Sequence, residues 1–199
     1  LPMVESILDQ ASVKLQDLDL IAYSRGPGAF TGVRIAAGVA QGLAFGAELP
    51  LLAISTLEAM GLAAFYADES LDQVVVCQDA RMQEVYVCAY QKAPPGKEGN
   101  QIQPLMNEQV LAPEKLDLAN LEKAMGVGSG WSYISQMPQQ TQDKITTHQM
   151  THPQAEFIAR IAKQQFQQGI NTSVEQAQPV YVRDQVTWKK VSEQGKPAK

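Results

Sequence analysis

Apolar residues in the first third of the chain recur with a helical period in some segments and run together in others. The spacing in LPMVESILDQA predicts an amphipathic helix at the start of the chain. The apolar runs LDLIAYS and LPLLAIS predict two buried strands, separated by a long helix from Thr31 to Gly46. A further helix follows in TLEAMGLAAFYA, where Ser55 and Glu58 fit a capping box. This alternation predicts an α/β fold with a parallel sheet.

The residues that flank the long helix predict how it begins. The segment RGPG is typical of a tight turn after a strand. Thr31 is a residue type that caps helices. Phe30 and Ile35 have the spacing of a hydrophobic staple across such a cap. We therefore expect the helix to start directly after Thr31.

The pattern changes after residue 67. LDQVVVCQDARMQEVYVCAYQ contains two strand-like runs around a polar turn and predicts an antiparallel hairpin. PEKLDLANLEKAMG predicts a short helix ended by Gly126, and residues 153–168 predict an amphipathic helix closed by Gly169. We accordingly divide the chain into a first α/β subdomain, residues 1–67, and a second, residues 68–199.

Charge and composition narrow the function. The 199 residues include 21 acidic and 16 basic ones, a net charge of −5, which disfavours a main nucleic-acid surface. The basic cluster is predicted to be a solvated tail: Lys189, Lys190, Lys196 and Lys199. No apolar run reaches the length of a membrane span. The two cysteines, Cys77 and Cys88, lie in apolar runs without a disulfide pattern, so we expect a cytoplasmic protein.

The glycine turn before the long helix has one chemical interpretation. A strand, a glycine turn and a helix N-terminus create an anion site by geometry, here at Gly26, Gly28 and Thr31. The known phosphate fingerprints do not match, because the turn has no lysine and the spacing of Gly26, Gly28 and Gly32 misses G-x-G-x-x-G by one residue. A nucleotide or anion site here is kept as an alternative.

Close packing is the other interpretation of the long helix. Small residues recur every four positions along two adjoining stripes: Gly38, Gly42 and Gly46, and Gly32, Ala36, Ala40 and Ala44. Each interior glycine costs about 1 kcal/mol relative to alanine, so the helix gives up about 2 kcal/mol. Close approach of another backbone can offset this cost. That backbone belongs either to the protein's own sheet or to another chain, and each stripe could serve one of them.

Two further residue sets could carry chemistry. His148 and His152 are four apart, but a proline follows His152 and no third ligand lies nearby, so we predict no metal site. Asp79, Arg81 and Glu84 could form an acid–base set, although a solvated hairpin turn is the favoured interpretation. We predict no catalytic residues.

Five segments together carry a family resemblance: RGPGAFTGVRIAAGVAQGLAFG, LPLLAISTLEAM, QDARMQEVYVCAYQ, GVGSGW and AQPVYVRDQVTWKK. Along nearly its whole length the chain resembles the TsaB (YeaZ) family of gamma-proteobacterial type. The resemblance implies the fold of actin-like ATPases (ASKHA) with two subdomains. Members of this family begin with a strand hairpin, which is expected to be missing here because the sequence starts at the first helix.

The resemblance also implies a function. It indicates a non-catalytic scaffold or activator that binds TsaD, which transfers threonylcarbamoyl to adenosine 37 of tRNAs reading ANN codons. The TsaE ATPase completes the assembly, the tRNA is contacted only through the complex, and the protein also forms homodimers. No cofactor is required by this chain, although ATP or ADP could bind at a subunit boundary. The implied partner interface contains Met3, Val4, Ile7, Leu8, Thr31, Gly32, Ala36, Ala40 and Gly42.

Two other functions stay open at this point. The turn from Gly26 to Thr31 and the implied fold are compatible with a nucleotide-dependent ATPase or kinase. The turn at residues 79–83 argues against it, because a turn without glycine keeps the backbone away from a phosphate. A glycoprotease-like metallopeptidase would depend on His148 and His152 alone.

Overall fold

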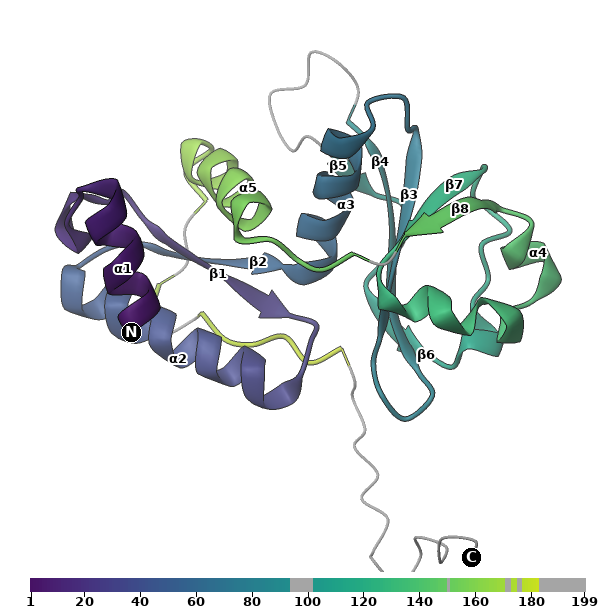
Figure 1. Cartoon of the computed structure of the whole chain (residues 1–199), viewed down its shortest axis with the longest axis horizontal. Coiled ribbons are helices and arrows are strands. Elements are labelled where there is room, and N and C mark those ends of the chain that lie inside the picture. Colours follow the sequence, from purple (N-terminus) through teal and green to yellow (C-terminus); the bar gives the residue numbers. More distant parts are fainter. Residues whose placement is uncertain (94–101, 150, 171–172, 175–176, 183–199) are drawn as a thin grey trace, which may run out of the picture.

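Two sheets organise the molecule in a computed structural model, which describes residues 1–93, 102–149, 151–170, 173–174 and 177–182 (Figure 1). The first sheet pairs β1 (Ile21–Gly26) and β2 (Leu51–Ser55) in parallel. The second contains β3 (Gln73–Asp79), β4 (Val85–Lys92), β5 (Ile102–Pro104), β6 (Gln109–Leu111), β7 (Ala124–Val127) and β8 (Ile145–Gln149). Its order is β5-β4-β3-β7-β8, with β6 also paired to β4. The predicted α/β fold is confirmed.

Helices surround and separate the sheets. The longer ones are α1 (Pro2–Ala11), α2 (Phe30–Ala47), α3 (Thr56–Ala67) and α5 (Ala155–Gln167); α4 (Gln139–Gln142) is a single turn. Three 3₁₀ segments, η1 (Leu15–Asp17), η2 (Pro113–Lys115) and η3 (Ser129–Gln136), lie in the connections. Figure 1 shows α2 and α5 on opposite faces of the first sheet, and α3 between the two sheets. Because α3 is apolar on nearly all sides, it can be buried between them.

One hydrophobic core connects the two halves. Leu52 and Ile54 of β2 belong to the same buried cluster as Val74 and Val76 of β3. Phe157 of α5 joins this cluster, although it lies in the predicted second subdomain. The last described residues also pack against the first sheet, where Ala177 is fully buried. Residue 67 therefore separates the two sheets along the sequence, but α5 and the following residues return to the first half.

The start of α2 differs from the prediction. Ala29 is the N-cap, with extended backbone angles, and Thr31 lies inside the first helical turn. Phe30 and Ile35 are both exposed, so they form no buried staple. The Phe30 ring instead packs on Tyr181, with 5.6 Å between ring centroids. The cap and staple predictions are wrong, because the glycine turn already ends at Ala29.

The helix predicted to end at Gly126 is also wrong. Only Pro113–Lys115 forms a helical turn, and Gly126 lies in β7, which pairs with β3 and β8. A Cβ on Gly126 would lie 2.6 Å from the Trp131 ring, so this glycine leaves room for a buried indole. The indole Nε1–H donates to the Val75 carbonyl oxygen over 3.3 Å. Strand pairing and this contact outweigh the helical pattern of the sequence.

Other local predictions are confirmed. β3 and β4 form the antiparallel hairpin, with Asp79 opposite Val85 at its turn. The first helix and α5 lie where they were predicted, and Gly169 follows α5 with a φ of +77°. The Ser55 side chain caps α3 by accepting hydrogen bonds from the backbone amides of Leu57 and Glu58. The basic cluster of the C-terminal tail lies outside the described residues.

Gly128 is the glycine that the fold needs most. Its φ of +106° and ψ of 172° fall in a region that only glycine adopts readily. A Cβ there would also overlap the Cys77 carbonyl oxygen. Gly128→Ala should therefore lower the free energy of unfolding by about 3 kcal/mol or more, as measured by urea denaturation.

Gly38→Ala is the matched control. A Cβ at Gly38 meets no atom of the described chain within 4 Å. In this helix interior the substitution should raise the free energy of unfolding by up to about 1 kcal/mol. Equal stability of the two variants would contradict this description of the Gly128 turn.

Candidate partner interface on α1 and α2

The two small-residue stripes of α2 have different environments. Ala37, Ala40 and Ala44 are buried and pack with Tyr23 and Leu51 of the first sheet. Gly38, Gly42 and Gly46 lie on another side, where an added Cβ would meet no atom of the described chain within 4 Å. Of the predicted stripe Gly32, Ala36, Ala40 and Ala44, the last two thus pack on the protein's own sheet together with Ala37, whereas Ala36 is half-buried and Gly32 is exposed. The other predicted stripe, the glycines, is open.

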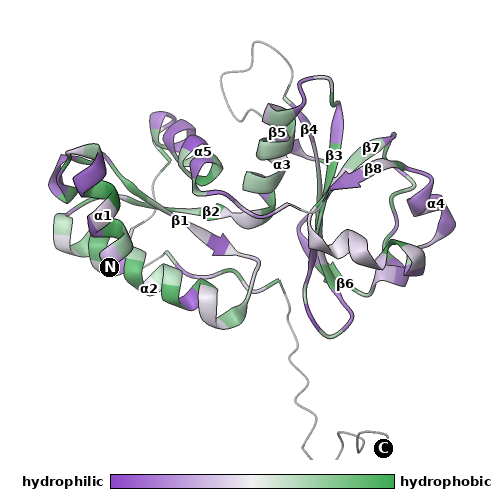
Figure 2. Cartoon of the chain, in the orientation of Figure 1, coloured by the Kyte–Doolittle hydropathy of each residue, from purple (hydrophilic) through white to green (hydrophobic). Residues whose placement is uncertain are grey.

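Large apolar side chains surround the open glycines. Ile35 is 61% exposed, Phe45 is 75% exposed, and Val39 is also exposed. In Figure 2, hydrophobic colouring runs along much of α2 on the outer side of the molecule. We call this surface the glycine face; it consists of Thr31, Ile35, Gly38, Val39, Gly42, Phe45 and Gly46. Apolar side chains gathered around bare backbone are typical of an interaction site.

α1 also exposes apolar residues. None of its residues is buried, although its apolar positions follow the helical period. Met3 is 77% exposed and Ile7 is 59% exposed, while Val4 and Leu8 are half-buried. Within the described structure, this helix therefore has an apolar side that the fold does not fully cover.

The structure separates the nine predicted interface residues into three groups. Met3, Ile7, Thr31, Gly32 and Gly42 are exposed, and Val4, Leu8 and Ala36 are half-buried. Ala40 is 5% exposed and packs on the first sheet, so we leave it out of the glycine face. Residue 40 is three and four positions from the buried Ala37 and Ala44, which places it on their side of the helix.

Three apolar residues of the glycine face escaped the prediction. Ile35, Val39 and Phe45 lie three or four positions from the open glycines, so helical spacing could have identified them. The missing information was which stripe faces the sheet. Both stripes have small residues at the same period, and only the tertiary structure distinguishes them.

The last described residues hold one flank of α2. The Gln41 side chain donates hydrogen bonds to the carbonyl oxygens of Val174, at 3.0 Å, and Ala177, at 2.9 Å. Arg34 Nε donates to the Tyr181 hydroxyl at 2.6 Å. Together with the contacts to β1, these bonds fix the rotation of α2 about its axis, and hence the direction of the glycine face.

The three residues of the alternative anion site lie in different environments. Gly26 is buried, with a φ of +98°, and the carbonyl oxygen of Val180 lies 3.4 Å from its Cβ position. Its open side is therefore occupied by the C-terminal segment. Gly28 and Thr31 are exposed at the start of α2. Anion binding there stays a prediction.

A polar junction connects the two sheets beside α3. Arg25, near the end of β1, donates to Glu108 Oε2 at 3.2 Å. The Ser55 hydroxyl donates to the other carboxylate oxygen while it caps α3. Burial raises the pKa of the neighbouring Glu58, an effect that the Arg25 charge partly offsets and the Glu108 charge adds to. Glu108 thus holds the segment between β5 and β6 against the first sheet.

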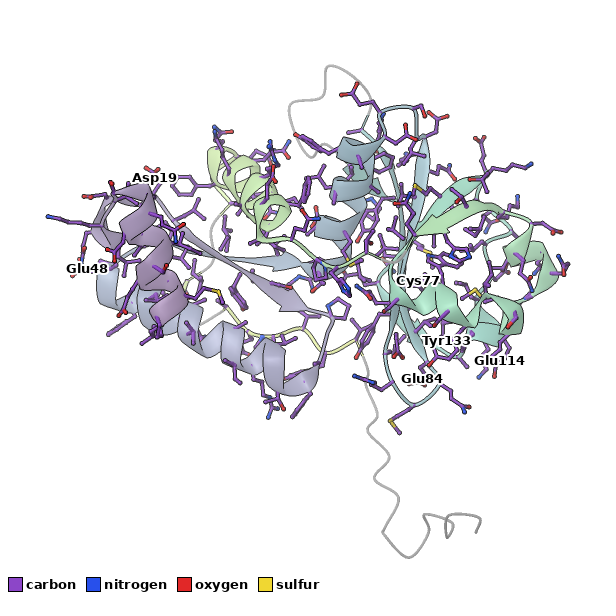
Figure 3. All side chains as sticks on the ribbon, viewed as in Figure 1. Asp19, Glu48, Cys77, Glu84, Glu114 and Tyr133 are labelled. Carbon is purple, nitrogen blue, oxygen red and sulfur yellow. The ribbon has the colours of Figure 1, made fainter. Side chains whose placement is uncertain are left out.

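The thiols are poorly suited to nucleophilic chemistry. Cys77 lies in the interior of the second half (Figure 3), and burial raises its pKa strongly. Burial also raises the pKa of Cys88, to about 11. Both groups are protonated at neutral pH, and thiolates are the reactive form of cysteine.

The two histidines lie in separate segments, and the residues of the β3–β4 turn bond to one another. His148 lies on β8, its ring stacked 6.4 Å from that of Trp131, and His152 lies in the non-helical segment before α5. Among the described residues, no three His, Cys, Asp or Glu side chains are grouped to hold a metal ion. Asp79 accepts a hydrogen bond from the Arg81 amide at 2.9 Å within the turn. Glu84 ends the turn and points outward (Figure 3).

Acidic residues lie at the end of the molecule that contains α1. Figure 3 shows Asp19, which precedes β1, and Glu48, which follows α2, pointing away from the fold there. Both side chains are exposed.

Within the described chain, every helix is too short or too polar to cross a lipid bilayer.

Comparisons with known proteins place this geometry in a family. The family described as "TsaD: tRNA N6-adenosine threonylcarbamoyltransferase" matches residues 1–191. The protein named tRNA threonylcarbamoyladenosine biosynthesis protein TsaB of Haemophilus influenzae is 39% identical over 96% of this chain and 81% of its own length. The protein of the same name in Escherichia coli is 38% identical over 96% of this chain and 82% of its own length.

Solved structures with a similar fold and sequence point to the same family. YeaZ from Pseudomonas aeruginosa is 38% identical, covers 90% of this chain, is itself 82% covered and has a TM-score of 0.79. A second Pseudomonas aeruginosa structure, described as an uncharacterised protein similar to peptidase YeaZ, is 39% identical, with 92% and 82% coverage and a TM-score of 0.80. The TsaD transferase of Sphingopyxis alaskensis matches only 36% of this chain and 21% of its own length.

These similarities show that the chain is an α/β protein related to TsaD. The share of the chain that each relative covers distinguishes the TsaB proteins from the TsaD transferases. TsaB relatives match almost the whole chain, whereas the TsaD transferase matches about a third of it. The chain belongs to the TsaB (YeaZ) family, as predicted from its sequence.

The raised pKa of Glu58 predicts a pH-dependent stability. A carboxyl whose folded-state pKa is above its ordinary value of 4.5 contributes stability at lower pH, and this contribution is lost as the pH rises through the folded pKa. Glu58→Gln removes a half-buried, partly desolvated charge, so it should raise the free energy of unfolding at pH 8. The gain should shrink towards pH 4 in urea denaturation.

Glu122→Gln provides the baseline for this measurement, because Glu122 is an exposed residue away from the junction. A stabilisation by Glu58→Gln that grows as the pH falls would contradict the assignment.

Proposed function

We propose that this chain is the non-catalytic scaffold or activator subunit that binds a TsaD transferase. With the TsaE ATPase, the pair supports threonylcarbamoylation of adenosine 37 in tRNAs reading ANN codons. The TsaB relatives, named for threonylcarbamoyladenosine biosynthesis, support the pathway. The observation that carries the scaffold role is the glycine face of α2, open and edged by exposed apolar side chains.

The energetic argument for a second chain starts from the glycines. Gly38 and Gly42 lie in the interior of α2 and together cost about 2 kcal/mol relative to alanine. Apart from the neighbouring backbone of α2 itself, no atom of the described chain lies within 4 Å of their Cβ positions, so the cost is not offset by contacts there. A partner helix laid against the glycine face could approach the backbone closely and supply the missing contacts. The exposed Met3 and Ile7 of α1 would extend such a contact.

A second copy and TsaD are both candidates for this surface. A face that binds itself must be self-complementary about a two-fold axis. We infer that the homodimer and the TsaD heterodimer use the same face and exclude each other. On this basis, only the chain released from the homodimer is available for the transferase.

Several features support a non-catalytic role within an ASKHA fold of two subdomains. The turn between β3 and β4 has left-handed backbone angles at Arg81, Met82 and Gln83, where a glycine would allow close approach of a phosphate. The acidic charge fits indirect contact with tRNA through the complex. The expected cytoplasmic location follows from the tRNA substrate. Calorimetry with ATP and magnesium tests the alternative, since turnover by the isolated chain would favour an ATPase or kinase.

A bulky residue on the glycine face should block partner binding. Gly42→Leu adds a side chain where the partner backbone is proposed to lie, and the open space there leaves the fold intact. We expect the affinity for a TsaD partner to fall by at least about tenfold, or 1.4 kcal/mol, in a titration by biolayer interferometry. Homodimerisation, followed by sedimentation, should fall with it.

Ala159→Leu is the control, because it makes a small-to-large change at an exposed position of α5. It should leave both affinities unchanged. Ala40 is unsuitable for this test, since a large residue there would disturb the packing on β1. Undiminished TsaD binding by folded Gly42→Leu would refute the proposed interface.

A further inference from the structure

A cavity of about 570 Å³ lies between the C-terminal half of α3, the ends of β7 and β8, and the start of α5. Its apolar floor includes Met60, Met125 and Phe157. None of the residues that line it belongs to α1 or α2, so it is separate from the glycine face. The volume lies within the range of small-molecule sites.

The polar lining of this cavity is rich in hydrogen-bond acceptors. It consists of Asp68, Gln149, Thr151, His152 and Gln154. Each of these side chains can accept a hydrogen bond, all but Asp68 can also donate one, and among the described lining residues there is no lysine, arginine or tryptophan. Asp68 is the acidic side chain among them, although the Lys92 charge also acts on its carboxylate and Arg160 contacts the lining residue Tyr66. A ligand that donates hydrogen bonds is favoured.

Two of these groups have unused bonding capacity. Asp68 accepts hydrogen bonds from the Ser70 amide, at 2.9 Å, and from the Ser70 hydroxyl, at 2.6 Å, both through Oδ1. These bonds lower the pKa of Asp68, so its carboxylate is charged at neutral pH. Within the described structure, the second oxygen, Oδ2, accepts no hydrogen bond and is left for a ligand. The Thr151 hydroxyl is buried and has no hydrogen-bond partner within the described structure.

Aromatic rings complete the lining. Tyr66 is 46% exposed and lies edge-on to Phe157, with 5.6 Å between centroids. The guanidinium of Arg160 lies over the Tyr66 ring, 4.8 Å from its centroid. This contact shows that the ring already attracts a cation in this environment.

We propose that this cavity binds a small organic amine. The ammonium group would donate to the Asp68 carboxylate near the Tyr66 ring, and an apolar or aromatic body would lie on Met60, Met125 and Phe157. Acidic and aromatic groups around an apolar floor form a pattern that recognises alkylammonium ligands. The same lining discriminates against acids of equal size.

The proposal can be tested with phenethylamine as the probe, by an NMR titration of the full chain. A ligand with only about nine heavy atoms should bind with a Kd of about 10 mM. Shifts should concentrate at residues 66–68 and 151–157. The uncharged 2-phenylethanol should bind about threefold more weakly, and phenylacetate more weakly still.

Variants identify the groups responsible. Asp68→Asn should reduce phenethylamine affinity about threefold without changing that for 2-phenylethanol. Glu69→Gln, which removes an exposed acid next to the cavity, should change neither. Ala67→Trp, at an exposed lining residue, should abolish binding by filling the opening.

Three results would overturn the inference: no shifts at these residues up to about 10 mM probe, phenylacetate binding as tightly as the amine, or unchanged amine affinity in Asp68→Asn.

Discussion

The packing of Ala37, Ala40 and Ala44 on β1 and β2 is the contact on which the rest of the account depends. Alanine brings the α2 backbone close to the sheet and leaves little freedom to rotate about its axis. Once this stripe faces inward, helical geometry turns Gly38 and Gly42 to the outside. Gln41 and Arg34 then hold the C-terminal segment along one flank of α2 by hydrogen bonds. One inward contact thus determines which surface is offered to a partner.

The rest of the fold presents this surface rigidly. α3 and α5 fill the other side of the first sheet and share one core with the second sheet. Glu108 adds a polar connection by bonding to Arg25 and to the N-cap of α3. A preorganised surface loses less conformational entropy on binding, which suits a protein whose proposed role is to hold an enzyme. The amine cavity beside α3 lies on elements that do not form the glycine face, so the two sites can be altered independently.

Sequence alone was sufficient where local chemistry decides the structure. The Ser55 cap, the β3–β4 hairpin and the amphipathic α5 follow from residue type and spacing, and the family follows from five segments. Sequence analysis failed where contacts between residues far apart in the chain determine the structure. Residues around Gly126 look helical, yet β7 forms because β3 and β8 pair with it and Trp131 needs the space. For the same reason the sequence did not show which stripe of α2 faces the sheet, since both stripes have the same period. The cavity proposed to bind an amine is lined in part by residues of α3, β7 and α5, which are far apart in the sequence. No sequence motif predicts it.

The central claim is that the glycine face and the apolar side of α1 become buried against a second protein. Hydroxyl-radical footprinting of this chain, first diluted until sedimentation shows it to be monomeric and then bound to a TsaD partner, tests it most directly. Met3 and Phe45 are 77% and 75% exposed in the single chain, and Met82, at the β3–β4 turn, is 68% exposed. The account predicts that oxidation of Met3 and Phe45 falls sharply in the complex while that of Met82 is unchanged. Protection of Met82 with continued oxidation of Met3 and Phe45 would contradict it.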